Sequence, residues 1–265
     1  MSHRASRIAR HAVVAAAAVF LAREAAANGS VAGFRAVTGP TVITRPGSYV
    51  VTRNISLGHP GTAIVIASSH VTLHLAGHTL SGPGGKQGTG ILVDGASAVN
   101  VLGGAVTRFG TGVEVRGSTN VRVEGLHVNG EDAGGPPPGE VGILVFNSRA
   151  VFLERNIVSN TFLGIFVRGG GSGGNRIAEN TLTGGASGQL GICYNPDGSG
   201  DPAGPSGDTV YNNLVSRFNV GIQTSTGTSG NIFRENDVAY FQTDIEEVGP
   251  GQNVFEGNTT VALVP

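Results

Sequence analysis

The sequence predicts an all-β fold in which short strands wind repeatedly around one axis, a parallel β-solenoid. Three observations carry this prediction: one phrase of residues recurs along the chain, its apolar residues fall at every second position, and glycine, asparagine and serine separate its short segments. A period of two is typical of strands, and the separating residues are typical of turns. Because a phrase of about 22 residues cannot bury its own apolar face, the copies must stack on one another.

The phrase is clearest in two consecutive copies between Val141 and Leu182. The first copy begins at Gly142 with the sequence Gly-Ile-Leu-Val, and the second begins at Gly164 with Gly-Ile-Phe-Val. Successive copies lie about 22 to 30 residues apart, so the longer spacings contain inserted loops. We expect the first inward-facing residues of eight copies to form one internal stack: Ile64, Ile91, Val113, Ile143, Ile165, Ile192, Ile222 and Ile245.

A column of asparagines supports the same register. Each asparagine lies two positions before the next inward-facing residue, as Asn156 lies before Val158. Asparagine tolerates the left-handed turn conformation, and identical amides stacked one strand spacing apart can bond to one another along the axis. We therefore expect a structural ladder of amides along the solenoid: Asn156, Asn180, Asn213, Asn236 and Asn258.

Length and composition fit one solenoid domain. The chain has 265 residues, of which 44 are glycine, none is tryptophan and 13% are charged. Such a composition suits narrow strands and tight turns better than a helical bundle. The regular positions of isoleucine, valine and leucine argue against a disordered low-complexity chain.

Residues 1–27 are typical of a secretion signal. Basic residues precede an apolar run from Ala12 to Ala22, and small residues up to Ala27 offer a cleavage site before Asn28. The run of about 11 residues is too short to span a bilayer, so we expect no membrane insertion. The sequence thus predicts a protein that is secreted or periplasmic after cleavage near Ala27.

The balance of charge limits the partners. Removing residues 1–27 takes away four arginines and one glutamate, which leaves 13 basic and 17 acidic residues and a formal charge of −4. An acidic chain is a poor match for nucleic acid or for an anionic membrane surface. The single cysteine, Cys193, excludes an internal disulfide, and its place among strand residues favours a buried apolar role over a reactive thiol.

Residues 28–60 are expected to form an N-terminal cap before the regular solenoid of residues 61–265. Strand-like segments flank a turn at residues 45–48, so we interpret this stretch as a β-hairpin or a first partial coil. A terminal segment of this kind would cover apolar surface that a neighbouring copy cannot cover.

Several phrases resemble a known family. Ile43–Tyr49 (ITRPGSY) and Val71–Gly82 (VTLHLAGHTLSG) resemble the opening of many secreted bacterial right-handed parallel β-helix proteins. The later copies Gly174–Asn180 and Gly230–Asn236 are similar to the parallel β-helix repeats of NosD-like and carbohydrate-processing members of the pectin-lyase-like superfamily. The resemblance covers roughly residues 41–260. It implies a single-stranded, right-handed parallel β-helix of about eight rungs with an N-terminal cap.

Outward-facing carboxylates are the first candidates for chemistry. Glu124 and Glu154 would be neighbours in the middle sheet, about 4.8 Å apart along the backbone. Two carboxylates at this spacing can form a retaining glycosidase pair, share a proton or hold calcium, the one cofactor that these residues suggest. Arg122, Arg155 and Arg176 lie near them in the same register, so a solvated ion-pair cluster is the simpler explanation. The full expected column is Ala76, Leu102, Glu124, Glu154, Ala178, Tyr211, Arg234 and Glu256.

Further candidates lie around this pair. His127, outward in the rung of Glu124 and beside Glu114, is a candidate general acid or base. The candidates for binding a saccharide are Phe166, Tyr211, Arg122 and Arg176. Phe166 also belongs to an apolar outward stripe with Leu144 and Cys193, a surface on which a sugar ring can stack. We predict no metal site from side-chain clusters, because the histidines at positions 70, 74 and 78 fall on a strand and a turn.

The resemblance implies that the protein binds or processes polysaccharide along its long face, and it leaves open whether any reaction occurs. Lyases, hydrolases and epimerases share the repeat. The long motifs of pectate lyases, the paired-Asp and Gly-His-Gly signatures of polygalacturonases and the Asp-Pro-His-Asp signature of mannuronan epimerases do not occur in this sequence.

Two other functions stay open. One is a noncatalytic adhesion or assembly module at the cell surface, and the other is a NosD-like periplasmic accessory protein. Copper handling finds little support, because the chain has one methionine and one cysteine. No charged or helical cap follows Asn258, so we expect self-association or a partner at the C-terminal edge.

Overall fold

The protein is a parallel solenoid of about nine turns. The computed structural model describes residues 33–131, 140–195, 203–249 and 252–263, and these residues contain strands and no helix. The predicted all-β class is therefore confirmed. The expected secretion signal and residues 28–32 of the expected cap lie outside the described residues.

Each turn contributes strands to three sheets. The first sheet contains β2 (Thr41–Ile43), β5 (Thr62–Ile66), β8 (Thr89–Asp94), β10 (Thr111–Arg116), β12 (Val141–Phe146), β15 (Leu163–Arg168) and β18 (Leu190–Asn195). The second contains β1 (Phe34–Val37), β3 (Gly47–Val51), β6 (Val71–His74), β13 (Arg149–Glu154), β16 (Arg176–Ala178), β19 (Thr209–Tyr211), β21 (Ser229–Arg234) and β23 (Gln252–Glu256). The third contains β4 (Ile55–Ser56), β7 (Thr79–Ser81), β14 (Ile157–Thr161), β17 (Thr181–Gly184) and β24 (Thr259–Ala262).

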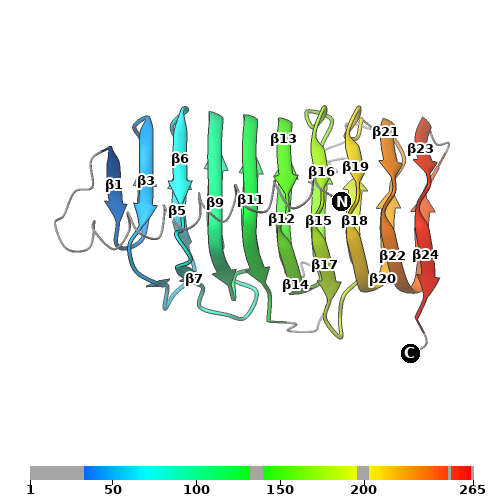
Figure 1. Ribbon diagram of the computed structural model, residues 1–265, viewed down its shortest axis with the longest axis horizontal. Helices are drawn as coiled ribbons and strands as arrows, with labels where there is room; N and C mark the ends of the chain where they lie inside the picture. The colour runs from blue at the N-terminus through cyan, green and yellow to red at the C-terminus, as the bar shows by residue number, and fades with distance from the viewer. Residues whose placement is uncertain (1–32, 132–139, 196–202, 250–251, 264–265) are drawn as a thin grey trace, which may run out of the picture.

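Four longer strands continue around a corner from one sheet to the next. The strands β9 (Ser97–Thr107) and β11 (Thr119–Asn129) run from the second sheet into the third. The strands β20 (Leu214–Thr224) and β22 (Asp237–Glu247) run from the third sheet into the first. Figure 1 shows the turns in chain order, from β1 at the blue end to β23 and β24 at the red end.

The predicted internal stack is confirmed. Ile143 pairs in parallel with Val113 of the preceding turn and with Ile165 of the following turn. The same register continues through the other predicted members, from Ile64 to Ile245. All of them are fully buried except Ile245, which is half-buried in the last turn. Apolar side chains one turn apart therefore form the continuous core of the solenoid.

The glycine that precedes six of the eight inward residues has a packing role. A Cβ added at Gly142 would collide with the side chain of Val158 and with the carbonyl oxygen of Gly164. The same obstruction exists at the corresponding glycines, Gly90, Gly112, Gly164, Gly191 and Gly221. The recurring Gly-Ile pair thus marks the place where the first sheet approaches the valine or leucine stack of the third sheet.

The predicted amide ladder is also confirmed. Asn156 donates from its backbone nitrogen and from Nδ2 to Asn180 Oδ1, both at 3.0 Å, and Asn180 repeats both bonds to Asn213. The ladder continues through Asn236 to Asn258. One part of the reasoning was wrong, because the left-handed backbone belongs to the residue before each asparagine: Arg155, Glu179, Asn212 and Glu235 have φ between 53° and 58°.

A second ladder lies at the corner between the first and second sheets, and the sequence analysis did not find it. Asn175 donates from its backbone nitrogen and its Nδ2 to the carboxylate of Asp208, at 2.8 and 3.1 Å. The backbone nitrogen of Asp208 donates to Asn231, which bonds in turn to Asn253. Each buried backbone nitrogen at this corner therefore has an acceptor one turn away.

The structure corrects the start of the fold. Residues 41–56 form a complete turn, in which β2, β3 and β4 pair in parallel with β5, β6 and β7. Of the two expected alternatives the hairpin is therefore wrong and the coil is correct, except that the coil is complete, and the rungs number about nine. The outward column of the second sheet also differs, because His74 and not Ala76 pairs with Leu102. Thr79 follows His74 by five positions, whereas their partners Ala105 and Leu102 are three positions apart, so this corner is two residues longer than the next one.

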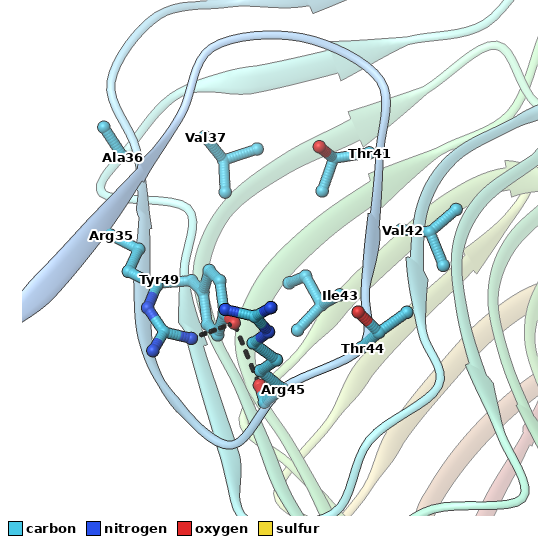
Figure 2. A pocket seen from close by; sticks show the side chains of 9 residues that line it. All are labelled: Arg35, Ala36, Val37, Thr41, Val42, Ile43, Thr44, Arg45 and Tyr49. Carbon is cyan, nitrogen blue, oxygen red and sulfur yellow. Dashed lines mark hydrogen bonds between the residues drawn. The ribbon is translucent and has the colours of Figure 1, made fainter.

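The N-terminal end of the described solenoid holds a cavity of about 280 Å³. Figure 2 shows it between β1 and β2. At its mouth, Arg35 Nη1 donates to the hydroxyl of Tyr49 at 2.7 Å, and this hydroxyl donates to the carbonyl oxygen of Arg45 at 2.9 Å. The lining residues are Arg35, Ala36, Val37, Thr41, Val42, Ile43, Thr44, Arg45 and Tyr49.

Candidate functional site

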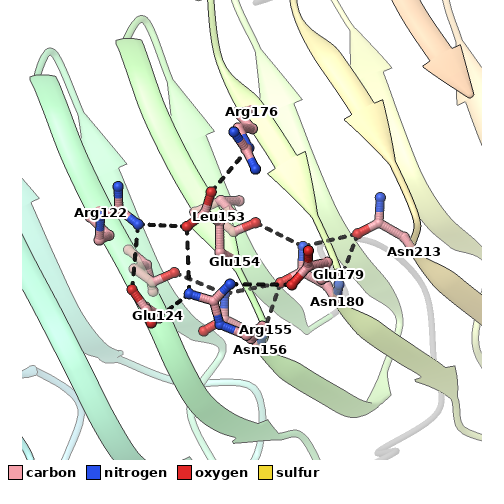
Figure 3. A network of polar contacts seen from close by, with 11 residues as sticks. Arg122, Glu124, Leu153, Glu154, Arg155, Asn156, Arg176, Glu179, Asn180 and Asn213 are labelled. Carbon is pink, nitrogen blue, oxygen red and sulfur yellow. Dashed lines mark hydrogen bonds and ion pairs between the residues drawn. The ribbon is translucent and has the colours of Figure 1, made fainter. Parts of the chain in front are cut away.

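The second sheet brings Glu124 and Glu154 together on its outer surface. The two residues are direct partners in the register of β11 and β13, as the sequence predicted. Arg122 joins them, because its Nη1 lies 3.4 Å from Glu124 Oε2 and 2.5 Å from Glu154 Oε2. Figure 3 shows this arginine between the two carboxylates.

Two further arginines complete the contacts of the carboxylates. Arg155 Nη2 lies 2.6 Å from Glu124 Oε1, and its Nη1 lies 3.2 Å from Glu179 Oε2. Arg176 Nε lies 3.0 Å from Glu154 Oε1. Every carboxylate oxygen of Glu124 and Glu154 therefore has a guanidinium partner.

The same surface continues toward the C-terminal end. The Tyr211 ring lies between Arg176 and Arg234, whose guanidinium carbons are 5.0 and 5.1 Å from the ring centroid. Arg122 lies over Phe152 at 5.3 Å. We call this set the second-sheet network: Arg122, Glu124, Phe152, Glu154, Arg155, Arg176, Glu179, Tyr211 and Arg234.

Burial and charge fix the network in place. Glu154 is only 5% exposed, whereas the side chains of Arg122, Arg176 and Arg234 are 38%, 44% and 41% exposed. Partial burial lowers the pKa of Arg155, but hydrogen bonds to Glu124 and Glu179 and the charge of Glu154 outweigh it, so the pKa is raised. Arg122, Arg155 and Arg176 thus each bind a carboxylate through part of the guanidinium group, while the side chain stays partly in solvent.

The contacts of Glu124 and Glu154 can be compared with the acid–base and calcium-binding roles that the sequence suggested for them. A general acid must carry a proton on a carboxylate oxygen that reaches the substrate, and a calcium site needs carboxylate oxygens free to coordinate. In Glu124 and Glu154 these oxygens face arginines instead. The arrangement is that of the ion-pair cluster, and the catalytic role of the two glutamates stays a prediction.

The other predicted residues lie on other sheets. His127 is exposed on the third sheet, between Ala105 and Ile157, and not beside Glu114 and Glu124. Phe166 is on the first sheet, between Leu144 and Cys193, with Arg168 6.0 Å from its ring centroid. The structure therefore groups Arg122, Glu124, Glu154, Arg176 and Tyr211, and it separates His127 and Phe166 from them.

The sequence analysis missed Glu179 and Phe152 as members of the network. Glu179 occupies the left-handed corner position just before a ladder asparagine, as Arg155 does one turn earlier. The recurrence of that position along the sequence was the signal that could have linked them. Phe152 occupies the outward position opposite Arg122 and Arg176 in the neighbouring strands.

The remaining site predictions concern metal, membrane and thiol chemistry. Within the described residues, no group of three or more His, Cys, Asp or Glu side chains could hold a metal ion, and calcium stays a prediction. No helix suited to crossing a membrane occurs in the part of the chain that the structure describes. Cys193 is a buried free thiol, and burial, with the charge of Glu246, raises its pKa to about 12.

Comparison with known proteins identifies the architecture. The structure is similar to that of a DFA-IIIase from Arthrobacter chlorophenolicus A6 without its lid, with a TM-score of 0.65 and 11% identity over 87% of this chain and 69% of that chain. It is similar to an alginate lyase from Paenibacillus sp. str. FPU-7, with a TM-score of 0.51 and 15% identity over 92% and 93% of the two chains. At such identities these likenesses show the fold.

A third similar structure is the enzymatically active domain of tailspike protein 2 of bacteriophage CBA120. Its TM-score is 0.55 at 13% identity, and the match covers 87% of this chain and 39% of that one. No curated protein matches the sequence significantly. A family model described as "Right handed beta helix region" matches residues 42–238, which is most of the chain. The chain therefore belongs to the right-handed β-helix family, as the resemblance of its repeats implied.

Proposed function

We propose that the protein binds a polysaccharide chain along the outer surface of its second sheet, through the second-sheet network. One observation carries the proposal: half-exposed guanidinium groups are held at fixed positions on one face by buried or partly buried carboxylates and by the Tyr211 ring. Donors that are already ordered lose little conformational freedom when a ligand binds them. Such donors suit sugar hydroxyl, ring and carboxylate oxygens.

The dimensions of the network suit an extended chain. Arg122 on β11 and Arg234 on β21 are four strand spacings apart along the sheet, through β13, β16 and β19. At about 4.8 Å per spacing, this is about 19 Å. A ligand of several sugar units lying along the solenoid axis would contact successive turns in the same way.

The ring of Tyr211 does not act as a stacking platform in this proposal. Arginines lie close to it on both sides, so its hydroxyl and edge are the parts that reach a ligand. Recognition would therefore rest on hydrogen bonds from Arg122, Arg176 and Arg234. Phe166, on the first sheet, belongs to a different surface.

Similar structures support the ligand class. One of them is an alginate lyase, and the solenoid that they share provides the same kind of long regular face. The full engagement of Glu124 and Glu154 by arginines favours binding over processing at this surface. We also propose secretion with cleavage near Ala27, which N-terminal sequencing of the exported protein would test.

Substitution of the network arginines tests the binding surface. Arg176→Ala and Arg234→Ala should each weaken polysaccharide binding about 10-fold or more, since a hydrogen bond to a charged group contributes about 1.5–3 kcal/mol. Arg217→Ala is the matched control, because Arg217 is exposed on β20 and away from the network. Affinity electrophoresis or calorimetry against acidic and neutral polysaccharides, with calcium and with chelator, would measure the change.

Two results would contradict the proposal. Binding that is lost in Phe166→Ala and kept in Arg176→Ala would place the ligand on the first sheet. Equal binding by wild type, Arg176→Ala and Arg234→Ala would exclude the network. Absorbance of unsaturated products in the same mixtures reports lyase activity, and Glu124→Gln, Glu154→Gln and His127→Ala would then show whether any predicted catalytic residue is needed.

A further inference from the structure

The two ends of the solenoid carry opposite charge. Between Gly33 and Val93 there is no aspartate or glutamate, and the charged residues are Arg35, Arg45, Arg53 and Lys86. Between residues 235 and 263 there is no lysine or arginine, and the acidic residues are Glu235, Asp237, Asp244, Glu246, Glu247 and Glu256. Because the turns follow chain order along the axis, the N-terminal end is basic and the C-terminal end is acidic (Figure 1).

Both ends also expose apolar side chains. Val42 at the N-terminal end is 60% exposed, and Val254 and Val261 at the C-terminal end are 47% and 56% exposed. Within the described residues, β1 pairs only with β3, and β23 pairs only with β21. An edge strand with a free row of backbone groups is a template for another strand.

One inward column links the two ends in the same register. Arg35 pairs with Tyr49, and this column continues turn by turn through the second sheet to Phe233 and Phe255. At the C-terminal end, Phe255 is half-buried and stacks on Phe233, with ring centroids 4.9 Å apart. At the N-terminal end, the Arg35 guanidinium carbon lies 5.5 Å from the Tyr49 ring centroid.

These features fit one another when β1 of one copy is placed beside β23 of a second copy. In the register of the column, Arg35 meets the outer face of Phe255, so its guanidinium lies between two aromatic rings. The arrangement is cation–π on both sides, and it is favourable when partly desolvated. In the same register Val254 lies beside Phe34, which covers the exposed valine.

We propose that copies of this chain associate end to end, with the acidic C-terminal end of one solenoid on the basic N-terminal end of the next. The partner is thus a second copy of the chain, joined through β23 and β1. The contact is heterologous, because two different surfaces meet, and a contact of this kind extends into open chains unless it closes into a ring. The proposal does not depend on polysaccharide binding, because the contact is made by β23 and β1, whereas the second-sheet network ends at Arg234 on β21.

Sedimentation velocity of the full chain over a range of protein concentrations tests the proposal. We expect oligomers at low salt and fewer of them at high salt, because salt screens attraction between the ends. Arg45→Glu changes the basic end, and Glu256→Arg changes the acidic end; both side chains are exposed. Each variant should raise the dissociation constant at least 10-fold. Arg217→Glu on β20, which lies inside the stack between β17 and β22, should not.

Mixing the two end variants gives the sharper test. Each variant keeps one intact end, so an equal mixture of Arg45→Glu and Glu256→Arg should associate at concentrations at which neither variant associates alone. The intact acidic end of the first variant meets the intact basic end of the second, and the two altered ends also carry opposite charges. Circular dichroism and urea midpoints equal to those of wild type would show that both variants fold. A full chain that is monomeric at low salt at every concentration overturns the proposal. Oligomers that persist in both variants, or a mixture that forms no dimers, overturn it as well.

Discussion

Asp208 is the one acidic residue in a ladder otherwise built from amides. Its carboxylate accepts two hydrogen bonds from Asn175, and the fully buried Tyr194 is its titratable neighbour. Burial raises the pKa of Asp208, although the hydrogen bonds from Asn175 act in the opposite direction. A carboxyl group with a raised pKa binds its proton more tightly in the folded chain than in the unfolded chain.

This property gives a stability prediction. The contribution of Asp208 is favourable below the pKa of the unfolded chain and is lost as the pH rises through the raised folded value. Asp208→Asn should remove that loss. At pH 7 the unfolding free energy of the variant should therefore be higher than that of wild type, by on the order of 1 kcal/mol. The difference should shrink toward pH 3. Urea unfolding of both proteins across this range measures it, and Asp237→Asn, exposed on β22, is the control.

At the scale of one strand or corner, the sequence predicted the structural features that repeat at the same position in every turn. The Ile143 stack and the Asn156 ladder were found because each turn repeats the same inward positions. The outward positions were harder, since they depend on the length of each corner. Two additional residues between His74 and Thr79 shifted one column, and the alternation of apolar residues did not reveal them.

The candidate site was predictable only in part for the same reason. The sequence analysis correctly predicted that Glu124 lies beside Glu154, because the two residues occupy equivalent positions in neighbouring strands. The position of His127 required knowing that β11 bends around a corner before this residue. The contacts of Glu179 with Arg155 depend on side chains that leave a left-handed corner, and a pattern of alternating residues does not describe them.

The glycine column gives a prediction at this scale. Gly142→Ala should lower the unfolding free energy by about 1–3 kcal/mol, because the new methyl group collides with Val158 and with the backbone of Gly164. Gly39→Ala is the matched control, since nothing lies within 4 Å of its added Cβ and its φ is not in the left-handed region. Urea denaturation compares the two variants. Equal stability would mean that the first sheet can move away from the third.

The whole molecule behaves as a one-dimensional stack. The named strands pair with strands of the adjacent turns, and the core and both ladders run along the axis. Stability in such a stack is a sum of terms within each turn and between neighbouring turns. The end turns have one neighbour each, and every residue of β24 is exposed. Local opening should therefore begin at the ends and should not cross an intact centre.

Hydrogen exchange of the ladder variant Asn180→Ala tests this one-dimensional behaviour. The substitution removes the acceptor for the backbone nitrogen of Asn156, so this buried donor is left without its partner at a cost of about 1–3 kcal/mol. The Nδ2 of Asn156 loses one of its two bonds and keeps the one to the carbonyl oxygen of Val123. Exchange should rise in β13, β14, β17 and β20, next to the defect, and stay unchanged in β3, β5 and β6. Asn219→Ala, on β20, should change neither region, because within the described residues its side chain makes no hydrogen bond and its backbone is not in the left-handed region. Faster exchange along the whole solenoid would show that the turns unfold together and would contradict the nearest-neighbour account.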